Sequence, residues 1–127
     1  MDPGRLTELL ATLVDIPSVT GREAAIAAFV AGRLGRIGSG ECLRSGEAVV
    51  WRGPRRDRPL VVLAGHLDTV PDPGGGKARL AGDRLYGRGA SDMKSGLAVM
   101  LALLESLDPA ALRFDLAAVF YDGEEGP

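Results

Sequence analysis

The fold of this chain is most strongly constrained by three successive segments of its sequence. They are a run of apolar residues at 60–65, a helical pattern at 94–107 and a second apolar segment at 114–121. The run at 60–65 lacks the alternation of a half-exposed strand, so it predicts a strand buried on both faces and central in its sheet. A strand, a helix and another strand in this order predict a βαβ crossover. We therefore expect an α/β fold in which a mixed sheet is flanked by helices.

The remaining segments complete the predicted secondary structure. Apolar residues with helical spacing predict a helix over 3–14, which Pro17 stops, and a second helix that runs to Leu34. Thr20 and Glu23 fit a capping box at the start of this second helix, in which the two residues satisfy each other's backbone donors. Two hairpins are also expected, with strands at 41–44 and 48–52, and at 78–80 and 84–86.

Composition and charge exclude several classes of protein. The chain has 127 residues, the size of one domain, and its 17 acidic and 15 basic side chains give no electrostatic case for binding nucleic acid. A single cysteine cannot form an internal disulfide, which indicates a reducing compartment. No apolar run approaches the roughly 20 residues of a membrane span. We therefore expect a cytoplasmic protein that does not bind membranes.

Polar side chains gather in three loops beside the core elements. His66 and Asp68 follow the first buried strand, Asp92 lies at the start of the long helix, and Glu124 and Glu125 follow the last strand. Ligands of open α/β sheets bind beyond the carboxyl ends of the strands. The three loops are therefore expected to converge on one site.

Each of these residues also has a purely structural explanation. A lone histidine is more often a surface or core residue than a ligand, and Asp92 fits the N-cap of the following helix. However, carboxylates gathered at one place repel each other unless a cation lies between them. In an extended segment Asp68 shares a face with His66, where it can orient the imidazole. The constellation predicts a site for one or two divalent metal ions.

Three motifs resemble, in order and spacing, those of the M20 family of metal-dependent amidohydrolases and peptidases. They are GHLDTVP at 65–71, GRGASDMK at 87–94 and EEG at 124–126. The resemblance implies that residues 1–127 are the N-terminal portion of a zinc-peptidase-like catalytic domain, without the lid or dimerisation domain. Within the family, FYDGEE at 120–125 most resembles the succinyl-diaminopimelate desuccinylases of actinobacteria, which release succinate and LL-diaminopimelate in lysine biosynthesis.

The resemblance implies a role for each site residue. His66 would bind one Zn²⁺ ion, Asp92 would bridge two, and Glu125 would bind the other, with Co²⁺ or Mn²⁺ as alternatives. Asp68 would orient His66. Glu124 would be the general base, which takes a proton from the attacking water and passes it to the leaving amine. The resemblance also implies a non-proline cis peptide near Asp92.

Members of the family supply a further acidic ligand and a second histidine from sequence beyond the Glu-Glu motif. This chain has one histidine, so we expect a truncated form that hydrolyses little by itself. A full-length member is expected to be a homodimer that acts on a small N-acyl amino acid. An acetylornithine deacetylase, an aminoacylase or a carboxypeptidase of the same family is an alternative. A non-catalytic binding domain that retains the fold is an alternative of another class.

Overall fold

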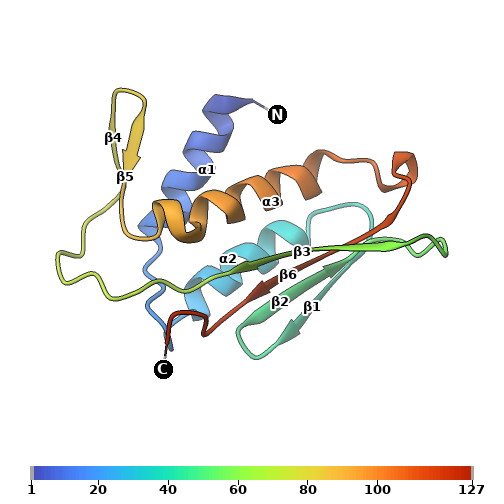
Figure 1. The fold of residues 1–127 in the computed structure, drawn as a ribbon, viewed down its shortest axis with the longest axis horizontal. Coiled ribbons are helices and arrows are strands. Elements are labelled where there is room, and N and C mark those ends of the chain that lie inside the picture. Colours follow the sequence, from blue (N-terminus) through green and yellow to red (C-terminus); the bar gives the residue numbers. More distant parts are fainter. Residues whose placement is uncertain (1, 127) are drawn as a thin grey trace.

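Three helices lie on one face of a four-stranded sheet in residues 2–126, the part of the chain that this computed structural model describes (Figure 1). The helices are α1 (Pro3–Asp15), α2 (Ala24–Leu34) and α3 (Ser95–Ser106), and the strands of the sheet are β1 (Glu41–Ser45), β2 (Ala48–Arg52), β3 (Leu60–His66) and β6 (Asp115–Tyr121). A separate hairpin, β4 (Arg79–Ala81) and β5 (Arg84–Tyr86), projects beside α1 (Figure 1). The predicted α/β class is confirmed.

The sheet is mixed, with strand order β1-β2-β6-β3. β3 and β6 are parallel and α3 lies between them in the chain, which confirms the predicted βαβ unit. The other neighbours are antiparallel. The parallel register runs from Leu60 opposite Asp115 to His66 opposite Tyr121. The two loops that follow β3 and β6 therefore leave the sheet side by side, at the carboxyl ends of these strands.

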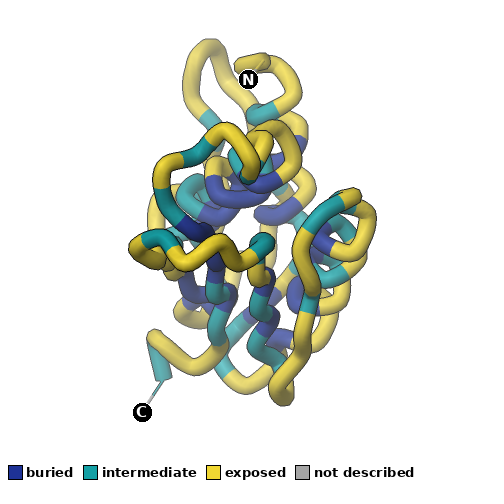
Figure 2. The backbone as a smooth tube through the Cα atoms, turned by 90° about the vertical axis from the view of Figure 1, so that its right-hand side faces the viewer, coloured by how far each residue is buried: buried dark blue, intermediate teal, exposed yellow. Residues whose placement is uncertain are grey.

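The core lies between the helices and the sheet, where most of the buried residues are found (Figure 2). Val49 and Trp51 of β2 pair with Phe120 and Ala118 of β6, and all four side chains face the helices and are buried. The helices contribute a matching set of buried apolar residues: Leu13, Ile26, Val30, Leu97 and Leu101. No helix within residues 2–126 is both long and apolar enough to cross a membrane.

The prediction that residues 60–65 form a central strand is wrong, because β3 is an edge strand. Leu60 is 64% exposed and Val62 is 49% exposed. The register places both on the face of the sheet away from the helices. An apolar run indicates that a strand is suited to burial on both faces, but it does not identify the segment that covers each face.

Further apolar side chains share this uncovered face. Leu43, Val50, Val119 and Ala64 stand directly opposite one another across the four strands. Leu43 is 38% exposed, whereas Val50 and Val119 are half-buried. With Leu60 and Val62 these residues form the uncovered apolar face of the sheet.

The same substitution on the two faces is expected to have contrasting effects. Val62→Thr changes the free energy of unfolding by less than about 0.5 kcal/mol, because its side chain is already in contact with solvent. Val49→Thr lowers it by about 1–3 kcal/mol, because the hydroxyl is buried without a partner. Chemical denaturation of the 127-residue chain measures both values. Equal losses would show that the far face of β3 is covered.

Candidate metal centre

Three of the five predicted site residues bring their ligand atoms together. His66 ends β3, Asp92 lies in the turn before α3, and Glu125 follows β6. His66 Nε2 lies 2.9 Å from Asp92 Oδ1 and 3.7 Å from Glu125 Oε1. The three ligand atoms all lie within 4.8 Å of one another. We call these residues the three-donor cluster.

The geometry of the three-donor cluster fits a divalent cation. In a tetrahedral zinc site with bonds of about 2.0–2.1 Å, neighbouring ligand atoms lie about 3.3 Å apart, between the two distances found here. The backbone carbonyl of Asp68 lies 2.9 Å from His66 Nδ1. A tautomer protonated at Nδ1 donates to this carbonyl and leaves the Nε2 lone pair directed at the carboxylates.

The electrostatics of the cluster also favour a cation. Burial lowers the pKa of His66, but hydrogen bonds to Asp92 and to the carbonyl of Asp68 outweigh this and raise it above its usual value. Burial and the adjacent Asp92 carboxylate raise the pKa of Glu125. The neighbouring carboxylates contribute to both pKa shifts, and a bound proton or a metal ion relieves their mutual repulsion.

The turn Ala90–Lys94 places Asp92 beside the end of β3. The Asp92–Met93 peptide is cis, as the family resemblance implied. Met93 Sδ accepts the backbone N–H of His66 at 3.3 Å, so the turn is tied directly to the strand. A Cβ at Gly65 would lie 2.9 Å from Met93 Cε, which is closer than real side chains approach. Glycine at position 65 therefore lets the turn pack closely against β3.

Lys94 anchors the other end of this turn. Its side chain is buried, and Nζ donates to the carbonyl oxygens of Leu13 at 2.8 Å and Ile16 at 2.7 Å, at the C-terminal end of α1. A cation at this end of a helix binds carbonyl groups that lack partners within the helix. Burial lowers the pKa of Lys94 to about 8. The lysine thus fixes the Asp92 turn to α1.

The Asp68 carboxylate lies near the imidazole of His66 and also binds the turn that carries the two glutamates. Asp68 Oδ1 is 3.5 Å from His66 Nδ1. The carboxylate also accepts the hydroxyl of Thr20 at 2.7 Å and the backbone N–H groups of Glu124 at 3.0 Å and Glu125 at 2.9 Å. Burial raises the pKa of Asp68, but these hydrogen bonds outweigh it and hold the pKa below its usual value. Asp68 therefore links the imidazole to the Glu-Glu turn.

Glu124 lies outside the three-donor cluster. Its side chain is exposed, and Oε2 accepts the hydroxyl of Tyr121 at 3.2 Å. Burial and the bond to Glu124 raise the pKa of Tyr121, so the phenol remains a donor. The two consecutive glutamates thus have different surroundings, one beside a histidine and an aspartate, the other beside a tyrosine.

The capping box predicted from Thr20 and Glu23 is wrong. The α2 helix begins at Ala24, and the side chain of Glu23 makes no capping bond. Thr20 instead donates to Asp68, and Glu23 Oε2 accepts the N–H of Gly123 at 2.9 Å. Sequence reasoning missed both residues as parts of the site, because a hydroxyl and a carboxylate three residues apart suit a helix start equally well.

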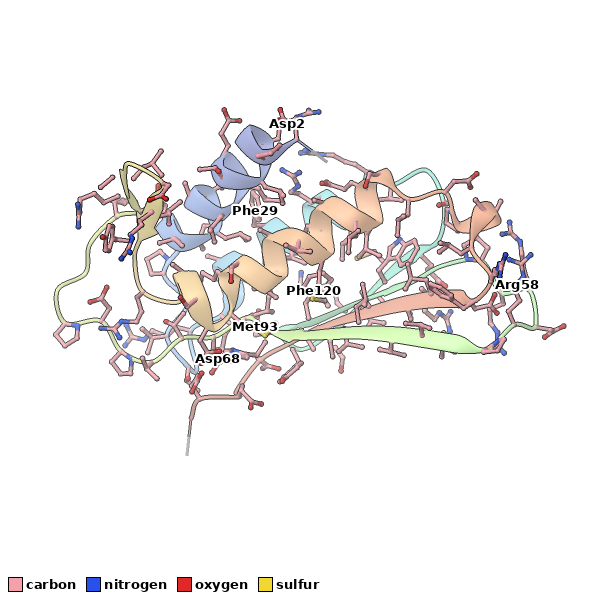
Figure 3. The ribbon with its side chains drawn as sticks, turned by 45° about the horizontal axis from the view of Figure 1, so that its top comes forward. Asp2, Phe29, Arg58, Asp68, Met93 and Phe120 are labelled. Atoms are coloured by element: carbon pink, nitrogen blue, oxygen red, sulfur yellow. The ribbon has the colours of Figure 1, made fainter. Side chains whose placement is uncertain are left out.

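A cleft of about 570 Å³ opens beside the three-donor cluster. Asp92 and Glu125 line it together with Val70, Tyr86 and Arg88. Its volume is in the range of pockets that hold small molecules. Figure 3 shows Asp68 and Met93 at this end of the molecule, near the start of α3, and Arg58 at the opposite end.

Replacing the buried lysine is expected to destabilise the chain. Lys94→Met leaves the Ile16 carbonyl without its donor, whereas the Leu13 carbonyl still accepts the N–H of Ile16 at 3.2 Å. A buried group that loses its partner costs about 1–3 kcal/mol. We expect a loss of about 1–3 kcal/mol in the free energy of unfolding. Lys77→Met, at an exposed lysine, is the matched control and should change it by less than about 0.5 kcal/mol. Equal stability of the two variants in urea would contradict the anchoring role.

Comparisons with known proteins agree with the three motifs. Residues 62–127 match the model of peptidase family M20/M25/M40. A Mycobacterium tuberculosis relative with the provisional name succinyl-diaminopimelate desuccinylase is 49% identical over 119 residues, which cover 93% of this chain and 33% of the relative. The succinyl-diaminopimelate desuccinylase of Corynebacterium glutamicum is 39% identical over 127 residues, 98% of this chain and 34% of that protein. The chain spans about a third of the length of these relatives.

Solved structures share the fold. The aminopeptidase PepT from Bacillus cereus superposes with a TM-score of 0.83 at 20% sequence identity. The match covers 98% of this chain and 38% of the aminopeptidase. At this identity the likeness concerns the fold alone, and it agrees with the predicted mixed sheet flanked by helices.

Proposed function

Because this chain belongs to peptidase family M20/M25/M40, we propose that residues 1–127 form the N-terminal portion of the catalytic domain of a zinc-dependent amide hydrolase. The observation that carries the proposal is the three-donor cluster at the edge of a cleft, inside the segment that matches the family. Imidazole and carboxylate are the donors of catalytic zinc sites, and such sites keep one position open for water or substrate.

Each residue of the site has a role in this proposal. His66, Asp92 and Glu125 would hold the metal, and Asp92 would serve both ions where two are bound. Bound zinc polarises a carbonyl and makes water more acidic. The Glu124 carboxylate takes a proton from the attacking water and delivers it to the leaving amine. The hydroxyl of Tyr121 holds one oxygen of Glu124 and so orients the base. Asp68 positions both His66 and the Glu-Glu turn.

The proposed substrate is an N-succinyl amide of LL-diaminopimelate, which yields succinate and LL-diaminopimelate in lysine biosynthesis. Its support is the name shared by relatives that are 49% and 39% identical over almost the whole of this chain. We further propose a cytoplasmic protein that acts as a homodimer when the dimerisation domain of the family is present.

The uncovered apolar face supports the proposal of a larger domain. Leu60 and Val62 expose apolar side chains beside the unpaired edge of β3. Exposed apolar surfaces of this kind are commonly covered by other protein segments. The relatives have about two thirds of their length outside the matched region, which is ample sequence to cover such a face.

Zinc binding tests the three-donor cluster directly. The chain has one histidine, so the imidazole NMR signal of His66 reports on zinc without overlap. We expect the signal to shift on titration with Zn²⁺. Asp92→Asn and Glu125→Gln should each weaken binding by at least about 10-fold, because each removes an anionic ligand.

Glu124→Gln is the matched control for this titration. It alters an adjacent carboxylate that lies outside the cluster, so the dissociation constant for Zn²⁺ should stay within about threefold of the unmodified value. An absence of any shift in the unmodified chain, or an equal loss in Glu124→Gln, would overturn the assignment of the ligands.

Turnover tests the proposed base. In a longer protein that carries these residues, Glu124→Ala should lower kcat for N-succinyl-LL-diaminopimelate by about 10²- to 10⁴-fold, the usual contribution of a general base. Zinc content should remain nearly unchanged. Retained turnover removes Glu124 from this role, and faster turnover of N-acetylornithine than of the succinyl substrate would favour a deacetylase.

A further inference from the structure

Two buried carboxylates from distant parts of the chain hold the turn that carries the glutamate pair. Asp68 accepts the backbone N–H groups of Glu124 and Glu125, and Glu23 accepts that of Gly123 at 2.9 Å. Three consecutive backbone donors therefore point at two side chains. Successive N–H groups of a turn form a concave surface that binds anions, and here the anions are side chains of the protein itself.

Burial of Glu23 needs an explanation. Its residue is 2% exposed, and within residues 2–126 it forms no ion pair. Burying a carboxylate without a cation is unfavourable unless hydrogen bonds hold it. Capping of α2 does not account for it, because the side chain makes no bond to the helix start. Its bond to Gly123 is what connects this carboxylate to the rest of the molecule.

We propose that Glu23 is a positioning residue for the metal centre, which accepts the N–H of Gly123 and thereby fixes the direction in which the turn presents Glu124 and Glu125. The roles of Glu124 and Glu125 rest on the proposed function, whereas the hydrogen bond from Gly123 to Glu23 is a feature of the structure. Gly123 has a φ of 77°, a conformation that favours glycine, so the chain changes direction at the residue that Glu23 holds.

Glu23 and Thr20 act on the turn from the same segment of the chain. Thr20 Oγ1 donates to Asp68 Oδ2 at 2.7 Å, and the same oxygen of Asp68 accepts the N–H of Glu125. The segment before α2 thus contacts the Glu-Glu turn directly through Glu23 and indirectly through Asp68. Residues that orient metal ligands in this way commonly change metal affinity by about 10- to 100-fold when they are replaced.

Three substitutions of Glu23 separate its possible contributions. Glu23→Gln keeps an oxygen acceptor at the same distance and removes the charge. Glu23→Ala removes the acceptor. Glu23→Asp keeps a carboxylate but shortens the side chain by one methylene, so the bond to Gly123 is lost while the buried position stays polar. If Glu23→Ala does not fold, the comparison of Glu23→Asp with Glu23→Gln still decides the question.

Two readouts are followed in the 127-residue chain: hydrogen exchange of the Gly123 amide, and the affinity for Zn²⁺ from the imidazole signal of His66. In Glu23→Ala and Glu23→Asp we expect exchange to accelerate about 10-fold or more, because the side-chain acceptor of the Gly123 N–H is lost. Zinc affinity should fall by about 10-fold or more. Glu23→Gln should keep both quantities within about threefold.

Asp115→Ala is the matched control. Asp115 is also a buried carboxylate and accepts the N–H of Arg56 at 3.0 Å, but it begins β6, whereas Gly123 follows the end of this strand. Asp115→Ala should lower the free energy of unfolding and leave the affinity for Zn²⁺ within about twofold of that of the unmodified chain. An equal loss of affinity in Asp115→Ala would show that affinity follows stability, and it would overturn the proposal.

The readouts also separate this inference from the proposed function. If the unmodified chain does not bind Zn²⁺, the proposed function fails, and exchange at Gly123 alone decides whether Glu23 holds the turn. Unchanged exchange in both Glu23→Ala and Glu23→Asp overturns the inference, whether or not zinc binds. Faster exchange with unchanged zinc affinity also overturns it, because the contact then has no effect on the metal centre.

Discussion

The parallel pairing of β3 with β6 is the constraint on which the candidate site depends. Seven consecutive pairs keep the two strands in register up to His66 and Tyr121. The backbone N–H of Leu67 continues this pairing by donating to the carbonyl of Tyr121 at 2.7 Å. The loops beyond the strands therefore lie side by side, and Asp68 can bond to the turn after β6. The close contact of Met93 with the end of β3 then adds the third donor segment.

Backbone hydrogen bonds stabilise some of the acidic side chains of the site, but not all of them. Asp68 and Glu23 are buried and accept backbone N–H groups, whereas the side chains of Asp92 and Glu125 line the cleft. The first pair is stabilised by the protein itself. The second pair is crowded against one imidazole and gains most from a cation. This division explains why adjacent carboxylates in one small region serve different purposes.

Sequence patterns predicted the elements well, because amphipathic spacing and apolar runs depend on local geometry. They also indicated that His66, Asp92 and Glu125 would meet, since the ends of parallel strands share an edge. They failed where a side chain had equally good local and distant partners. Thr20 and Glu23 suit a helix start, yet both bond across the fold to the segments of the site. The central position predicted for β3 failed for a related reason, because hydrophobicity alone does not identify the covering segment.

The outer edge of β3 has a practical consequence for work with this chain alone. From Leu60 to His66 the strand contains no proline, lysine or acidic residue, the residues with which natural edge strands discourage further pairing. Within residues 2–126 no other strand pairs with its outer edge, so the backbone donors and acceptors there can pair with a strand of another molecule. The exposed side chains of Leu60 and Val62 favour such pairing. An edge of this kind favours self-association of the chain at high concentration.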